Sequence, residues 1–159
     1  MKKFLATASL LPALVLGADA TQTFILSNPA FANFEVTPST VILTTTGAEA
    51  GEEMEDVVSE VTRMSLSTNK RNLVMHVAAV KLPSDTELKI EILDDGSRGN
   101  NRYDNAGEVT LSSVEQPVLT NIDRARIKEA VVRFKLSTSL DTEAFSSTGV
   151  YVVYTITEA

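Results

Sequence analysis

Four stretches of the chain alternate apolar and polar side chains residue by residue. In the clearest of them, Val132, Phe134 and Leu136 alternate with Arg133 and Lys135. Successive side chains of a β-strand point to opposite faces, so a period of two indicates strands with one buried and one solvent-exposed face. Such strands are typical of antiparallel sheets. The inward positions of the other three stretches are Thr62, Met64 and Leu66; Leu73, Met75 and Val77; and Leu88, Ile90 and Ile92.

Turn-forming residues separate these stretches from one another and from several shorter ones. The polar segments 69–72 and 83–85 stand at hairpin spacing between neighbouring strands, and a polar loop runs over 94–107. Seven to nine short strands with such turns predict an all-β fold, an immunoglobulin-like antiparallel β-sandwich. A closed barrel or a jelly roll is the alternative. We expect strands over 33–36, 40–45, 58–67, 72–80, 87–93, 108–113, 117–121, 129–137 and 149–157.

Three segments carry further local signals. Residues 150–157 read VYVVYTIT, in which every side chain is β-branched or aromatic. This composition predicts a central strand that is covered on both faces. The apolar residues of 54–61 have helical spacing and permit a short helix there, and residues 123–130 permit a single helical turn capped by Asp123.

The first twenty residues have the three regions of a secretory signal peptide. Two lysines follow Met1, residues 4–16 are apolar and uncharged, and residues 18–20 (Ala-Asp-Ala) have the small side chains of a cleavage site. A helix that spans a bilayer needs about 20 apolar residues, more than this run supplies. We therefore expect a signal peptide over 1–20, one immunoglobulin-like domain over 21–159, and export to the periplasm or cell surface without a transmembrane anchor.

Composition narrows the classes of function. The chain has 14 Lys+Arg against 21 Asp+Glu and a formal net charge of −7. A nucleic-acid-binding protein needs a basic face, so we expect no nucleic-acid partner. There is no cysteine, and His76 is the single histidine, which excludes thiolate and multi-histidine metal sites. We expect no catalytic site, no cofactor and no resident metal.

Two oxygen-rich segments leave alternatives open. Acidic residues gather between 49 and 60 without a basic residue among them, and the loop 94–107 has the Asp, Asn and Gly content of extracellular calcium loops. Solvated loops explain both segments, and Arg98 and Arg102 would repel a cation from the second. The alternatives to a structural role are a monomeric exported module that binds calcium or a carbohydrate, and a carboxylate-dependent extracellular hydrolase.

Two segments resemble a known group of exported proteins. The chain ends on Gly149 and a Tyr-containing strand (147–157, STGVYVVYTIT), and the segment 66–69 (Leu-Ser-Thr-Asn) forms a polar strand end. In these features the chain is similar to bacterial surface-fibre subunits of the spore-coat-U and archaic chaperone–usher pilin type. It departs from that group in having no cysteine pair, and Glu158 stands where classical pilins have a tyrosine next to last.

The resemblance implies assembly by strand complementation, in which the N-terminal strand of one subunit completes the sheet of the next. It also implies an assembly chaperone as a possible partner. The candidate segment is 21–36 (TQTFILSNPAFANFEV). The alternative is that this segment is the first strand of its own domain, which Pro29 favours because it interrupts the alternation. The side chains that the resemblance assigns to strand exchange are Phe24, Leu26, Phe31 and Phe34.

The export prediction is checked by mass spectrometry of the protein collected outside the cytoplasm. We expect cleavage after Ala20, so Thr21 is the N-terminal residue of the exported form. An exported form that retains Met1 would contradict the prediction.

Overall fold

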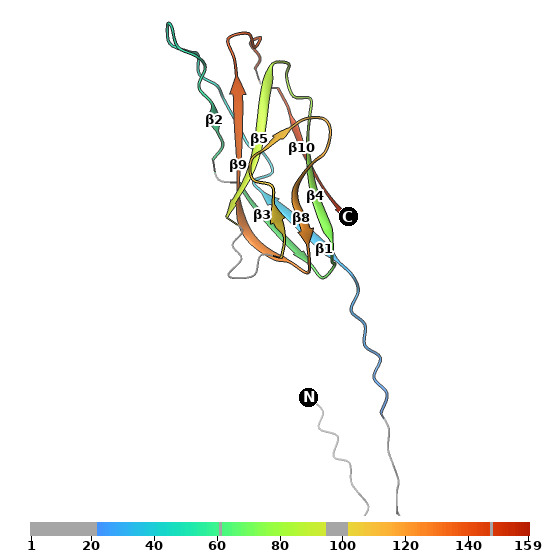
Figure 1. Cartoon of the computed structure of the whole chain (residues 1–159). Helices are drawn as coiled ribbons and strands as arrows, with labels where there is room; N and C mark the ends of the chain where they lie inside the picture. Colours follow the sequence, from blue (N-terminus) through green and yellow to red (C-terminus); the bar gives the residue numbers. More distant parts are fainter. Residues whose placement is uncertain (1–21, 61, 95–101, 147) are drawn as a thin grey trace, which may run out of the picture.

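In a computed structural model of the chain, the described residues form ten antiparallel strands in two sheets that pack face to face (Figure 1). The structure describes residues 22–60, 62–94, 102–146 and 148–159. The predicted all-β antiparallel sandwich is confirmed. Two strands of only two residues raise the strand number above the seven to nine expected. The predicted signal peptide, 1–20, lies outside the described residues.

The two sheets differ in size. The larger contains β1 (Ala32–Thr37), β2 (Val57–Val58), β3 (Thr62–Thr68), β5 (Thr86–Asp94), β7 (Val109–Leu111) and β9 (Arg126–Thr138). The smaller contains β4 (Leu73–Val80), β6 (Asp104–Asn105), β8 (Gln116–Ile122) and β10 (Tyr151–Glu158). The order in the larger sheet is β1-β3-β9-β5-β7, with β2 also paired to β9, and the order in the smaller is β10-β4-β8-β6.

The core lies between the sheets and is built from the alternating residues that the sequence indicates. Met64 and Leu66 of β3, and Met75 and Val77 of β4, are almost completely buried, and Val132 of β9 is as well. Burial of such side chains provides the main stabilisation of a sandwich without disulfides. The other large buried side chains with under 2% exposure are Leu73, Ile90, Leu119, Ile122 and Ile127, together with Thr62.

From β3 to β10, successive strands alternate between the two sheets. The prediction that 69–72 and 83–85 sit in hairpins is therefore wrong, because each of these turns carries the chain across the core from one sheet to the other. Asn72, Lys81 and Asp85 have φ of 55°, 65° and 56° in these connections. A short turn can join paired neighbours or bridge two facing sheets, and turn spacing alone does not distinguish them.

Three other expectations from the sequence are corrected by the structure. The segment 54–61 contains β2 and the segment 123–130 contains the beginning of β9, in place of the permitted helices. β2 pairs with β9, and this first part of β9 pairs with β3. No strand is present over 40–45, although Leu43 packs against the core. The closed barrel is excluded, since β1, β7, β10 and β6 are edge strands among the described residues. In the part of the chain that the structure describes, no helix is long and apolar enough to cross a membrane.

The core assignment predicts a large difference between two matched leucine substitutions. Leu66 is 0% exposed and Leu140 is 71% exposed. We expect Leu66→Ala to lower the free energy of unfolding by about 2–5 kcal/mol, because it leaves a cavity in a packed core. Leu140→Ala should change it by less than about 0.5 kcal/mol. Urea denaturation of both variants checks this, and similar losses for the two would contradict the core described above.

Candidate functional site

β10 lies at the edge of the smaller sheet, which corrects the prediction that it is a central strand. It pairs with β4 over all eight residues, from Tyr151 opposite Val80 to Glu158 opposite Leu73, with no register shift. No other strand among the described residues pairs with β10. On such an edge, every second residue directs its backbone N–H and C=O groups away from the sheet, where they lack a strand partner.

β10 also lacks the features that normally protect an edge strand. Protected edges carry charges, proline or bulges, or are very short. β10 has no charged residue before Glu158, no proline and no bulge. The other edges are different: β1 contains Glu35 and is followed by Pro38, and β6 and β7 have only two and three residues. Among the described edges, β10 is therefore the long and regular one, and it carries no charge before its last residue.

The core is only half covered on the side of the sandwich formed by the edge strands β1 and β10, which we call the β1–β10 side. Phe34 of β1 and Tyr154 of β10 belong to different sheets, and their ring centroids lie 5.2 Å apart with an interplanar angle of 44°. Most inward side chains of the other strands are almost fully buried, and Leu43, Leu82 and Val109 are partly buried. Six partly buried apolar residues that pack on the core come from this side: Phe34, Val36, Val150, Val152, Tyr154 and Ile156.

The N-terminal segment, residues 22–31, contains no strand and extends away from the sandwich (Figure 1). Phe24, Ile25 and Leu26 are 71%, 95% and 88% exposed. Leaving side chains of this size in water forgoes roughly 1.5–3 kcal/mol of burial free energy for each. A run of three exposed large apolar residues on an extended segment is therefore typical of a segment that is buried by another surface.

Only the last residues of this segment are attached to the domain. The N–H of Phe31 donates a hydrogen bond to Asn69 Oδ1 at 2.9 Å, and Asn69 Nδ2 donates to the carbonyl of Pro29 at 2.9 Å. Thr68 Oγ1 donates to the carbonyl of Phe31 at 2.8 Å. These bonds hold 29–31 beside the turn that follows β3, and within the described part of the chain no hydrogen bond or ion pair is found for 22–28.

The structure divides the four strand-exchange candidates into two groups. Phe24 and Leu26 lie on the exposed segment and share one face by strand alternation. Phe34 belongs to β1 and packs against the domain's own core, and Phe31 stands between the two groups at 41% exposure. The sequence reasoning missed Ile25 and the unprotected edge of β10. The lack of charge over 150–157 is the signal that could have indicated this edge.

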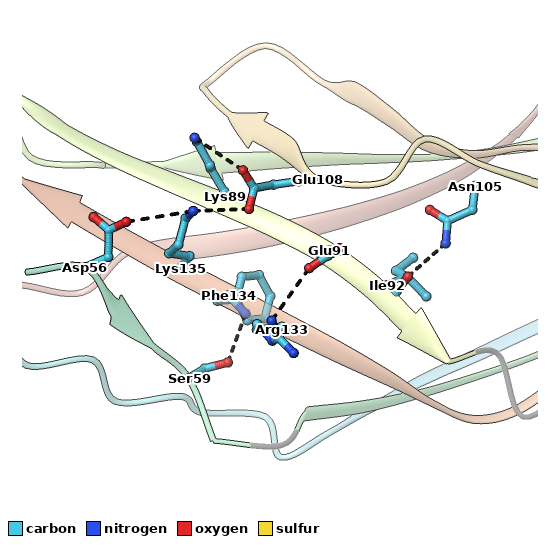
Figure 2. A network of polar contacts seen from close by, with 10 residues as sticks. All are labelled: Asp56, Ser59, Lys89, Glu91, Ile92, Asn105, Glu108, Arg133, Phe134 and Lys135. Atoms are coloured by element: carbon cyan, nitrogen blue, oxygen red, sulfur yellow. Dashed lines mark hydrogen bonds and ion pairs between the residues drawn. The ribbon is translucent and has the colours of Figure 1, made fainter.

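The outer face of the larger sheet has a different character, because ion pairs cover it (Figure 2). Glu108 lies between Lys89 and Lys135, with N···O distances of 3.3 Å to each. Lys89 also pairs with Glu87 at 2.9 Å, and Lys135 pairs with Asp56 at 3.8 Å. The network connects β5, β9 and the segments beside β2 and β7, so this face is charged and internally paired.

These contacts shift two pKa values. Hydrogen bonds from Lys135 and Lys89 lower the pKa of the Glu108 carboxyl below its ordinary value. Hydrogen bonds to Glu87 and Glu108 raise the pKa of Lys89. Both shifts favour the charged forms, which is the expected effect of an opposite charge within hydrogen-bond distance.

The described residues contain no group of three or more Asp, Glu or His side chains that could hold a metal ion. Most of the oxygen-rich loop, 95–101, lies outside the described residues. In its described part, Asn121 Nδ2 donates to Asp104 Oδ2 at 2.6 Å, and Asn105 Nδ2 donates to the carbonyl of Ile92 at 2.8 Å (Figure 2). His76 lies within β4, with its Nδ1 buried and without a hydrogen-bond partner among the described residues.

No protein-family model matches the chain, and no curated protein or solved structure matches it either. The features of the structure that bear on function are β10, the β1–β10 side and the segment 22–31.

The ion-pair network predicts a pH-dependent effect of Glu108→Gln. A carboxyl whose pKa is lower in the folded state stabilises the fold above its unfolded pKa, and this stabilisation is lost as the pH falls through the folded pKa. We expect the variant to have a lower Tm than the wild type near neutral pH, and the difference to shrink as the pH falls below about 4. Thermal unfolding from pH 7 to pH 3 measures this.

Glu53→Gln is the matched control, since Glu53 is exposed and forms no ion pair among the described residues. Its Tm should follow that of the wild type throughout. A Tm difference for Glu108→Gln that does not depend on pH would show that the carboxylate charge is not what stabilises this face.

Proposed function

We propose that the chain is an exported structural subunit of a surface fibre or pilus-like assembly, in which the N-terminal segment of one copy adds as a strand to β10 of the next. One observation carries the proposal: β10 has the composition of a central strand, but it lies at an unprotected edge. An added strand would make β10 central, and its composition would then match its environment.

The energetics support strand addition at this edge. Backbone hydrogen bonds would form along the free edge of β10, and a strand there would also cover the half-buried side chains of the β1–β10 side. Phe24 and Leu26 of the incoming segment would contribute roughly 1.5–3 kcal/mol each if fully buried. Isolated edge strands with exposed apolar segments tend to associate for these reasons.

The direction in which the segment 22–31 leaves the sandwich supports binding to another copy of the chain. It departs from the end of the sandwich where β1 begins and extends beyond that end (Figure 1). A contact between two different surfaces of identical subunits is heterologous, and repeating it produces a filament when the rotation does not close a ring. One chain that carries both a donor segment and an acceptor edge therefore suits a fibre subunit.

The resemblance to surface-fibre subunits of the spore-coat-U and archaic chaperone–usher pilin type agrees with this proposal. It adds an assembly chaperone as a second partner for the same edge before assembly, and a periplasmic or cell-surface location. In this function the protein performs no catalysis. The calcium- or carbohydrate-binding module and the carboxylate-dependent hydrolase remain alternatives from the sequence, and the described residues add no observation in favour of either.

The proposal predicts that residues 21–28 are needed for assembly but not for folding. A chain that begins at Pro29 keeps β1 and the hydrogen bonds at Pro29 and Phe31. We expect it to have the same Tm as the chain that begins at Thr21, because 22–28 makes no hydrogen bond or ion pair with the described residues of the domain. Only the longer chain should form polymers at rising concentration, as measured by sedimentation velocity and electron microscopy.

A matched pair of variants tests the role of the apolar face. Phe24→Asp with Leu26→Asp should abolish assembly, whereas Thr23→Asp with Ser27→Asp places the same charge on the other face of an extended segment and should not. A chain starting at Thr21 that stays monomeric at high concentration would contradict the proposed function. So would a chain starting at Pro29 that polymerises as well as the longer one.

A further inference from the structure

Burial of Phe24 and Leu26 leaves two exposed aliphatic side chains of the same region unexplained. Ile25 stands between them and is 95% exposed. When the segment pairs as a strand, alternation turns Ile25 to the face opposite theirs. On the edge strand β10, Val153 is 45% exposed. Both side chains therefore belong to a face that the covering of the core does not involve.

Val153 lies on the outer face of the smaller sheet. Its neighbours Val152 and Tyr154 pack against the core, so alternation turns Val153 away from it. Val153 pairs with Ala78 of β4, and Tyr151 pairs with Val80. The outward residues of β4 and β10 contain no Asp, Glu, Lys or Arg, in contrast to the ion-paired outer face of the larger sheet (Figure 2).

Two charged side chains reach this face from neighbouring segments. Lys81 Nζ lies 5.2 Å from the centroid of the Tyr151 ring, and Glu115 Oε1 accepts a hydrogen bond from Thr155 Oγ1 at 2.6 Å. Tyr151 and Thr155 stand two residues before and after Val153 in the strand. Val153 remains exposed between them, and it is the aliphatic position on this face that an added strand can cover.

The residues that face the core limit the register of the added strand. A slip of one residue would turn Phe24 and Leu26 to the outer face, so only every second register covers the β1–β10 side. The free part of the segment, 22–28, is about as long as β10, which has eight residues. A register that pairs most of both strands places Ile25 directly opposite Val153 or one position away on the same face, and side chains at both separations are within reach of each other.

We propose that Val153 receives Ile25 of the segment that a second copy of this chain adds beside β10. The inference rests on the proposed function and deepens it, because the added strand is then held on both of its faces. Phe24 and Leu26 cover the core on the inner face, and Ile25 packs on the outer face. The contact needs no opposite charge, since 21–28 and 150–157 are both uncharged.

A double-mutant cycle tests whether the two side chains meet. Ile25→Ala and Val153→Ala should each raise the concentration at which half of the protein is assembled, roughly two- to fivefold, the effect of losing a cross-strand apolar pair. The double variant should be no weaker than the weaker single variant, because the first substitution already removes the contact. Sedimentation velocity of the chain that begins at Thr21 measures this. The Tm of dilute Ile25→Ala should equal that of the wild type, because Ile25 is exposed in the free subunit.

Val114→Ala is the matched control. Val114 is 66% exposed and precedes β8, which β4 separates from β10 in the sheet. We expect this variant to assemble as the wild type does. Combined with Ile25→Ala, it should assemble as Ile25→Ala does alone.

The two proposals fail in different ways. If the wild type assembles and the fold-changes of Ile25→Ala and Val153→Ala multiply in the double variant, the side chains do not meet, and the inference is overturned while the fibre function stands. An Ile25→Ala variant that assembles as well as the wild type has the same consequence. A wild type that stays monomeric at high concentration overturns both proposals.

Discussion

The two sheets are held together because each presents one apolar face to the other, and every other feature of the molecule depends on that contact. β9 is the longest strand, and in the larger sheet it pairs with β2, β3 and β5. With no cysteine in the chain, burial of the alternating side chains carries the stability that disulfides supply in many exported domains. On the β1–β10 side this burial is incomplete.

The candidate site joins two parts of the chain that are far apart in the sequence. The segment 22–31 provides exposed apolar side chains at one end of the molecule, and β10 provides a regular edge with no charge before Glu158, no proline and no bulge. Each is unusual for a monomer, since exposed apolar runs and open edges both promote association. A single explanation covers both when the segment of one copy completes the sheet of another.

Much of this arrangement could be predicted from local patterns. The period of two located β3, β4, β5 and β9 and identified which of their side chains face the core. The resemblance to surface-fibre subunits indicated Phe24 and Leu26 as candidate donor residues, and their exposure depends on the tertiary structure. The sequence did not indicate β10 as a candidate acceptor. The composition of 150–157 suits a strand with a neighbour on each side, but among the described residues only β4 pairs with β10.

The sequence by itself determined the all-β class, the inward face of most strands and the apolar character of the N-terminal segment. These are consequences of side-chain alternation, which acts between residues a few positions apart. Only the tertiary structure decided that successive strands from β3 onward alternate between sheets, that β10 is an edge, and that Phe34 meets Tyr154. Sheet order depends on hydrogen bonds between residues distant in the chain, and a turn such as 69–72 has the same local chemistry whether it joins two strands of one sheet or leads across the core.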